Sequence, residues 1–230
     1  MKPDWTSIAE LRERWGDSLL TVLTVLILIM MFVVAPLQAL GLFEFQIFEL
    51  FLALFLIGGV FLMSGSAFAV VAMLVALIMI VTAGILRLRS PSILDLNLFA
   101  GSWLIVGITL AVTVARATFA PGRVTYHRVI GAVLLYLSVA IVFAAFYTFI
   151  GTLLPKAFSG MKMEDSPALA SQLIYFSFMT LTTTGYGDVA PLHPIARSLC
   201  NLEAIFGQLY PATLLARLVT LEIEHRKEEP

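Results

Sequence analysis

The sequence has few charged residues and almost no cysteine. Only 13% of its 230 residues are Asp, Glu, Lys or Arg, about half the share usual in soluble domains. Cys200 is the single cysteine, which excludes an intrachain disulfide and a metal site built from several cysteines. The net charge of −1 provides no basic surface for a nucleic acid. A nucleic-acid-binding protein or a disulfide-stapled scaffold is therefore not expected.

Apolar side chains dominate instead, at 60% of the sequence. They form runs near the length of about 20 residues that crosses the hydrocarbon of a bilayer. These features predict an all-α membrane protein whose transmembrane helices contact membrane lipids. The six predicted spans cover residues 19–40, 43–63, 67–86, 94–115, 129–154 and 195–220.

Between the last two runs lies an apolar segment, residues 169–181, that is too short to cross a membrane. Ser166 and Pro167 predict a helix start before it, because serine can cap a helix and proline is tolerated in the first turn. We expect this helix to re-enter the membrane and to end near Thr182. The non-helical backbone that follows must then be enclosed by protein or line a water-filled pore.

That backbone reads Thr183-Thr184-Gly185-Tyr186-Gly187 and is followed by Asp188. The two glycines can adopt backbone angles that clash for other residues, so that consecutive carbonyl groups can point the same way. The stretch resembles the selectivity filter of the potassium channel superfamily, whose pattern is Thr-Val-Gly-Tyr-Gly. Thr184 departs from this pattern, and its hydroxyl should change the packing behind the filter more than the ion sites.

The resemblance implies ion-binding sites and an assembly. K+ would bind the carbonyls of Thr183, Thr184, Gly185 and Tyr186 and the hydroxyl of Thr183, with Gly187 completing the filter. The Tyr186 side chain would pack behind the filter, away from the pore. One loop cannot surround an ion, so a homotetramer is implied. No cofactor is expected, since K+ is the permeant ligand, and no residue set predicts an enzyme.

Two further side chains are expected to support the filter. Asp188 would lie at the outer mouth, where the resemblance implies a hydrogen bond to an aromatic donor of the pore helix, here Tyr175. Glu203 lies in the sixth run, and a carboxylate there should face protein or water. Two roles are open for Glu203: bracing the pore helix as a protonated acid or through Thr180 or Thr182, or facing the pore cavity.

Gly207 and Pro211 predict a bend in the sixth run. Gly207 lies where inner helices of the superfamily often have a hinge glycine, and Pro211 has no N–H to give to the Gly207 carbonyl. A fixed kink and a moving gate both fit this pair.

Basic residues predict the orientation. With the N-terminus inside, nine Lys and Arg residues fall on the inner side and five on the outer side. Both termini would thus be cytoplasmic, in a protein of the plasma (inner) membrane. Arg87 and Arg89 fall on the outer side, where we expect them to pair with Glu44 and Glu49 of the second span.

The predicted organisation has five parts. Residues 1–18 form either an interfacial helix or a frayed tail, 19–117 a four-helix domain, 118–128 a basic linker, 129–222 the pore domain and 223–230 a short tail. The fourth span, residues 94–115, contains no arginine, so voltage sensing is not expected. No soluble ligand-binding domain is expected after the last span.

These observations favour a potassium-selective channel that conducts passively. The alternatives are a subunit of a potassium uptake transporter, which uses related filter loops, and a non-conducting regulatory or assembly subunit. The sequence does not identify the stimulus that opens the pore, its rectification or the role of the first four helices.

Overall fold

The computed structural model describes residues 19–41, 54–60, 66–89, 92–119, 126–164 and 166–228. Its first helix is Leu19–Ala39, which includes a π-helical segment, η1 (Met30–Val34), and the α-helical turn α2 (Ala35–Ala39). The other helices and strands follow in chain order: α4 (Ala67–Arg89), α5 (Ile93–Thr118), α6 (Tyr126–Leu153), β1 (Phe158–Ser159), α7 (Pro167–Leu181), β2 (Ala190–Pro191) and α8 (Pro194–Glu228).

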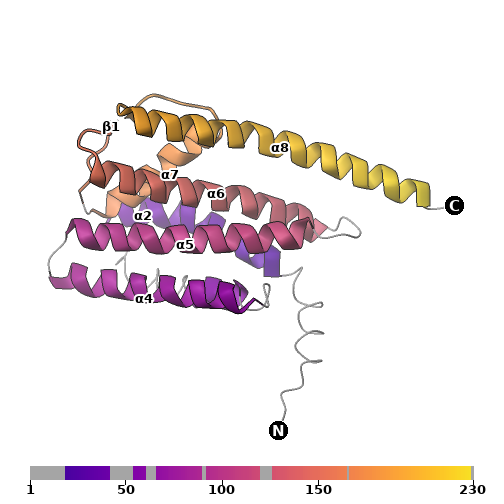
Figure 1. Ribbon diagram of the computed structural model, residues 1–230, viewed down its shortest axis with the longest axis horizontal. Coiled ribbons are helices and arrows are strands. Elements are labelled where there is room, and N and C mark those ends of the chain that lie inside the picture. Colours follow the sequence, from indigo (N-terminus) through magenta and orange to yellow (C-terminus); the bar gives the residue numbers. More distant parts are fainter. Residues whose placement is uncertain are drawn as a thin grey trace, which may run out of the picture.

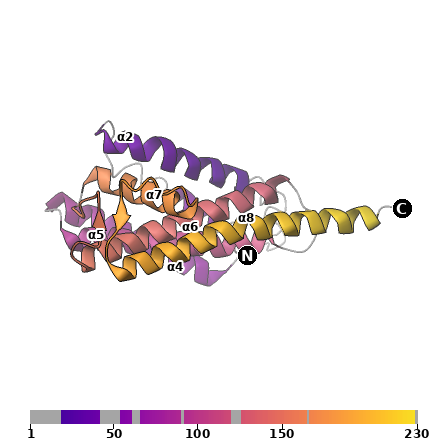
Figure 2. The same ribbon diagram turned by 90° about the horizontal axis from the view of Figure 1, so that it is seen from above.

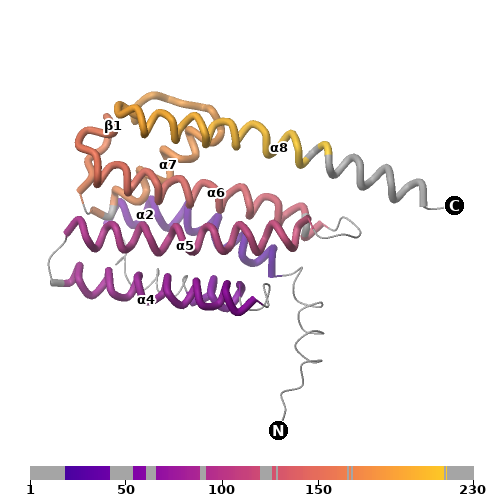
Figure 3. Tube along the Cα trace, in the orientation of Figure 1, coloured from indigo at the N-terminus to yellow at the C-terminus, as the bar shows by residue number. Residues whose placement is uncertain are grey.

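The long helices pack side by side. In Figure 1, α4, α5, α6 and α8 lie next to one another in that order, and each contacts its neighbour. The first helix lies on another side of α6, and α7 fills the space between them, in contact with α2, α6 and α8 (Figure 2). The path from α6 through α7 and back along α8 can be followed in Figure 3. Helix α7 is therefore enclosed on several sides by longer helices.

Local sequence explains where two helices change course or begin. Pro36 has no N–H to donate to the carbonyl of Phe32, and the π-helical hydrogen bonding of η1 precedes this break. Helix α5 begins with a capping box: the Ser92 side chain accepts from the Asp95 backbone N–H, and the Asp95 side chain accepts from the Ser92 backbone N–H.

Four helices of the described residues are long and apolar enough to cross a membrane: Leu19–Ala39, Ala67–Leu88, Ile93–Thr118 and Val129–Leu153. The chain is thus a helical integral membrane protein. The predicted second span lies mostly outside the described residues, which show a helix at 54–60. Helix α8, the predicted sixth span, is 35 residues long but carries polar side chains along it and is not one of these four.

Three local features differ from the expectations. Helix α8 continues beyond the predicted end near Thr220 to Glu228, since no glycine or proline interrupts that stretch. Ser166 takes the N-cap position of α7, but its side chain makes no capping hydrogen bond. The chain is also not purely helical, because β1 and β2 pair antiparallel, with Phe158 opposite Pro191 and Ser159 opposite Ala190.

Candidate functional site

The site is the loop that follows α7. The Thr183 N–H donates to the Thr180 carbonyl at 2.9 Å, and the Gly185 N–H donates to the Met179 carbonyl at 3.1 Å. Alternate residues of the loop have positive φ angles: 56° at Thr183, 53° at Gly185 and 80° at Gly187. Positive φ is uncommon for a residue other than glycine, so the conformation of Thr183 is an outlier that marks the loop as specialised.

The whole loop from Thr182 to Asp188 is exposed in the single chain. The Tyr186 side chain, which was expected to pack behind the filter, is 73% exposed. Packing of this ring would therefore require a second chain.

Hydroxyl groups of the loop bond to one another and to α8. The Thr182 and Thr184 hydroxyl oxygens lie 2.9 Å apart. Thr184, the residue that departs from the filter pattern, therefore has a hydrogen-bond partner in Thr182. The Gln208 side chain donates from Nε2 to the Thr183 hydroxyl oxygen at 2.8 Å. Sequence reasoning missed Gln208, although an amide within an apolar run was a usable signal.

Gly207 allows α8 to approach the end of α7. A Cβ at this position would lie 1.8 Å from the Leu181 carbonyl oxygen, a distance at which backbone must move. The same carbonyl accepts a hydrogen bond from the Tyr136 hydroxyl at 3.3 Å. The absence of a side chain at Gly207 is thus required by close packing, whether or not the residue also bends. Helix α8 continues through Pro211 without a break.

Glu203 is fully buried between three helices. Tyr147 of α6 donates its hydroxyl to Glu203 Oε2 at 2.5 Å, and the Ser177 hydroxyl of α7 lies 2.5 Å from Glu203 Oε1. The predicted partners were wrong, because the hydroxyls of Thr180 and Thr182 bond to carbonyls of their own helix, those of Phe176 and Phe178. Glu203 joins α6, α7 and α8 within the protein and does not face a cavity.

A count of hydrogens indicates which protonation state satisfies this network. The Ser177 hydroxyl also lies 2.9 Å from the Ala140 carbonyl oxygen, which can only accept. Three hydrogen bonds therefore need three hydrogens, while Tyr147 and Ser177 supply one each. A proton on Glu203 completes the set, and burial without a cationic partner in this network favours the same neutral form.

Aromatic rings pack on both sides of this network. Tyr147, Phe158 and Phe176 form a cluster with ring centroids 4.9–5.7 Å apart. Tyr136 stacks on Tyr210 at 5.9 Å. The hydroxyl of Tyr210 donates to the Ala132 carbonyl at 2.8 Å, which fixes α8 to α6.

The Asp188 end of the loop lies against the segment between α6 and α7. Tyr175 and the Asp188 carboxylate interact electrostatically, and the expected hydrogen bond between them stays a prediction. Gly160, with a φ of 82°, lies so close to Asp188 that a Cβ would be 1.9 Å from the Asp188 carbonyl oxygen. The pairing of β1 with β2 places Gly160 there. Sequence reasoning missed this contact, which a glycine in a polar connection does not reveal by itself.

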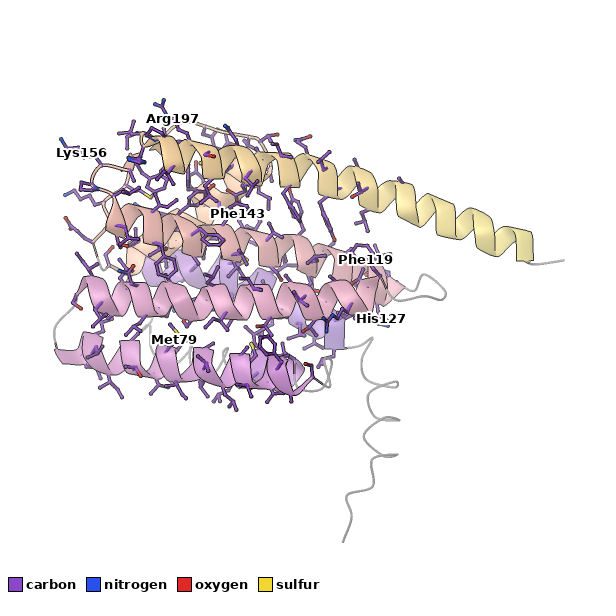
Figure 4. The ribbon with its side chains drawn as sticks, viewed as in Figure 1. Met79, Phe119, His127, Phe143, Lys156 and Arg197 are labelled. Carbon is purple, nitrogen blue, oxygen red and sulfur yellow. The ribbon has the colours of Figure 1, made fainter. Side chains whose placement is uncertain are left out.

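The other charged and titratable residues considered in the sequence analysis belong to other parts of the chain. Arg87 has an interaction of its own, whereas Glu44, Glu49 and the side chain of Arg89 lie outside the described residues, so the expected pairs stay predictions. His127 Nδ1 lies 2.9 Å from the Thr21 hydroxyl oxygen. Figure 4 shows His127 and Phe119 near one end of the helices, and Lys156 and Arg197 near the opposite end.

Comparison with known proteins agrees with this geometry. The family described as "Ion channel" matches residues 135–223, which include α7, the loop and most of α8. Protein LctB of Bacillus caldotenax is 36% identical over 63 residues, which are 27% of this chain and 46% of that protein. The match thus spans less than half of LctB. No solved structure matches the chain. Residues 135–223 therefore match an ion channel family, which supports the resemblance to the potassium channel superfamily.

Proposed function

We propose that this ion channel is a potassium-selective pore formed by four copies of the chain, through which K+ moves passively down its electrochemical gradient. The observation that carries the proposal is the exposed loop Thr182–Asp188 at the end of a short, otherwise enclosed helix. Residues Thr183, Thr184, Gly185, Tyr186 and Gly187 would line the narrowest part of the pore.

The loop cannot face lipid. Non-helical backbone at membrane depth is stable only where protein encloses it or where it borders water. One chain leaves the loop exposed, so other copies must complete its surroundings. Next to it, four apolar side chains of α8 are 55–59% exposed at helical spacing: Ile195, Leu202, Ile205 and Leu209. Copies of the chain would cover this stripe.

Backbone conformation and charge both favour a cation. Alternating backbone handedness, as at Thr183, Gly185 and Gly187, can direct successive peptide groups to one side of a chain and so form an ion-binding row. The C-terminal end of α7 carries partial negative charge and precedes the loop directly. A row of carbonyls near this helix end would stabilise K+ without its water shell.

The proposal also includes topology. Six spans and the re-entrant α7 would place both termini in the cytoplasm and the Asp188 end of the loop outside the plasma (inner) membrane. The positions of Lys156 and Arg197 opposite His127 in Figure 4 are compatible with such a division into two membrane faces.

Reconstitution tests the proposal. The purified chain alone should form a particle with the mass of four chains. In liposomes it should conduct K+ much faster than Na+. Equal K+ and Na+ fluxes would contradict selectivity. A tetramer without flux would favour the non-conducting subunit, and flux that requires a second protein would favour the transporter subunit.

A further inference from the structure

A cavity lies between α7 and the helices that precede it in the chain. Its volume is about 290 Å³, and its walls come from the first helix, α4, α5, α6 and α7. A water molecule takes about 30 Å³ in the liquid, so the cavity has room for roughly ten water-sized groups. Most of its lining is apolar, including Phe99, Trp103 and Leu173. Such a lining favours an apolar occupant over a cluster of water.

Two buried polar atoms in the lining have no hydrogen-bond partner among the residues that the structure describes. Gln38 is 4% exposed and its Nε2 is unpaired, and Asp95 is 2% exposed and its Oδ2 is unpaired. The other Asp95 oxygen, Oδ1, is engaged by the Ser92 backbone N–H at 2.7 Å in the capping box. Unpaired buried polar atoms are costly, so a donor and an acceptor are missing from this cavity.

The chemistry of the two atoms restricts the head group of the occupant. The amide of Gln38 needs an acceptor, while the Asp95 carboxylate needs a donor. An ammonium group cannot accept from Gln38, and an anionic head would meet the Asp95 carboxylate. Arg87, which also lines the cavity, has an interaction of its own. A neutral hydroxyl both donates and accepts, so it matches the chemistry of both atoms.

We propose that this cavity binds a neutral amphiphile with one hydroxyl head group and an aliphatic body of about ten heavy atoms, the size set by the cavity volume. The hydroxyl binds between Gln38 and Asp95, and the aliphatic body lies against α6 and α7. Leu169, Leu173 and Ile174 of α7 line the cavity, so the occupant contacts the helix that carries the pore loop. The site does not depend on which ion the pore selects.

Photolabelling of the full chain in lipid nanodiscs tests the site. The probe is a 1-octanol that carries a diazirine, and labelled peptides are identified by mass spectrometry. We expect saturable labelling of residues in the cavity lining, competed by unlabelled 1-octanol. Gln38→Met keeps the length of the side chain but removes the donor, and it should weaken labelling about three- to tenfold, the value of one hydrogen bond.

A cavity-filling variant gives a second test. Gly84 lines the cavity, and a Cβ on it would meet nothing within 4 Å. Gly84→Leu should therefore fold and should lower saturable labelling at least about tenfold, because the new side chain occupies the space. Gly58 is the matched control: its Cβ would also meet nothing within 4 Å, and it is not part of the lining. Gly58→Leu should leave labelling unchanged.

The source of the amphiphile is resolved by solvent extraction of the purified protein. A fatty alcohol with a chain of about ten carbons that copurifies with the wild type and is depleted in Gly84→Leu identifies a membrane lipid as the source. Labelling by the added octanol without a copurifying lipid identifies free alcohols as the ligand. Labelling that is not saturable, or that neither Gln38→Met nor Gly84→Leu reduces, would overturn the proposal, and the octanol would then be dissolved in lipid only.

Discussion

Helices α4 and α6 have similar lengths and apolar compositions but opposite surroundings. In the most apolar part of each, 28% of α4 and 67% of α6 is buried inside the chain. The polar side chain of Thr82 in α4 bonds to a carbonyl of its own helix, whereas Tyr136 and Tyr147 of α6 bond to α7 and α8. Apolar composition makes both helices suitable for a membrane, but hydrogen bonds between helices define the pore unit. Substitutions should thus cost most around α6 and least on α4.

The largest effect is expected for Gly207→Ala. The added methyl group would lie 1.8 Å from the Leu181 carbonyl oxygen, and overpacking against backbone that cannot move away costs about 3 kcal/mol or more. We expect loss of the tetramer and of K+ flux, measured by size-exclusion chromatography and liposome assay. Gly58→Ala, whose Cβ meets nothing within 4 Å, is the control. A stable, conducting Gly207→Ala tetramer would refute the close-packing role.

The second-largest effect is expected at Glu203, where two substitutions should destabilise the protein to different extents. Glu203→Leu removes the acceptor of the buried Tyr147 hydroxyl and leaves the Ser177 hydroxyl with the Ala140 carbonyl alone, at about 1–3 kcal/mol for the unpaired Tyr147 hydroxyl. Glu203→Gln can still accept from Tyr147 and donate to Ser177, as the protonated acid does, and should cost less than about 1 kcal/mol. Thermal unfolding of the tetramer measures both. A Gln variant as unstable as the Leu variant would contradict a neutral Glu203.

A smaller effect, on selectivity, is expected for Gln208→Met. The variant keeps the length of the side chain but loses the 2.8 Å hydrogen bond to the Thr183 hydroxyl. We expect the K+/Na+ permeability ratio to fall about three- to tenfold, the value of one hydrogen bond. Leu74→Met, on the exposed face of α4 away from the loop, should leave the ratio unchanged. If Gln208→Met also leaves it unchanged, this bond does not support the loop.

The smallest effect is expected on α4. Ile78 is 65% exposed, so Ile78→Leu exchanges one lipid-facing side chain for another and should change stability by less than about 0.5 kcal/mol. Thermal unfolding of Ile78→Leu, measured in parallel with that of Glu203→Leu, compares the two losses of stability. A large loss for Ile78→Leu would mean that another chain covers α4, and the contrast between the two helices would then fail.

The helices themselves were largely predictable. Apolar runs place the starts of α4, α5 and α6 within a few residues of those observed, and Ser166-Pro167 predicts the start of α7. These features depend on hydrophobic length and local backbone preference, which one sequence contains. The end of α8 was less predictable, because no residue near Thr220 stops a helix.

The contacts between helices were not predictable to the same degree. Glu203 was expected to brace α7, but its partners Tyr147 and Ser177 depend on how three helices rotate about their axes. Gly207 was expected to be part of a fixed kink or a moving hinge, and its contact with Leu181 appears only once α8 is docked on α7. Gln208 and Gly160 were missed for the same reason. A periodic pattern gives the buried face of a helix but does not identify the residue opposite.

The most direct measurement of the central claim is the reversal potential of the purified chain in a planar bilayer. A tenfold K+ gradient, balanced by Na+, should shift the reversal potential by about 59 mV towards the K+ equilibrium value. A reversal potential near zero would show that the Thr182–Asp188 loop does not distinguish K+ from Na+ and would contradict a potassium-selective filter.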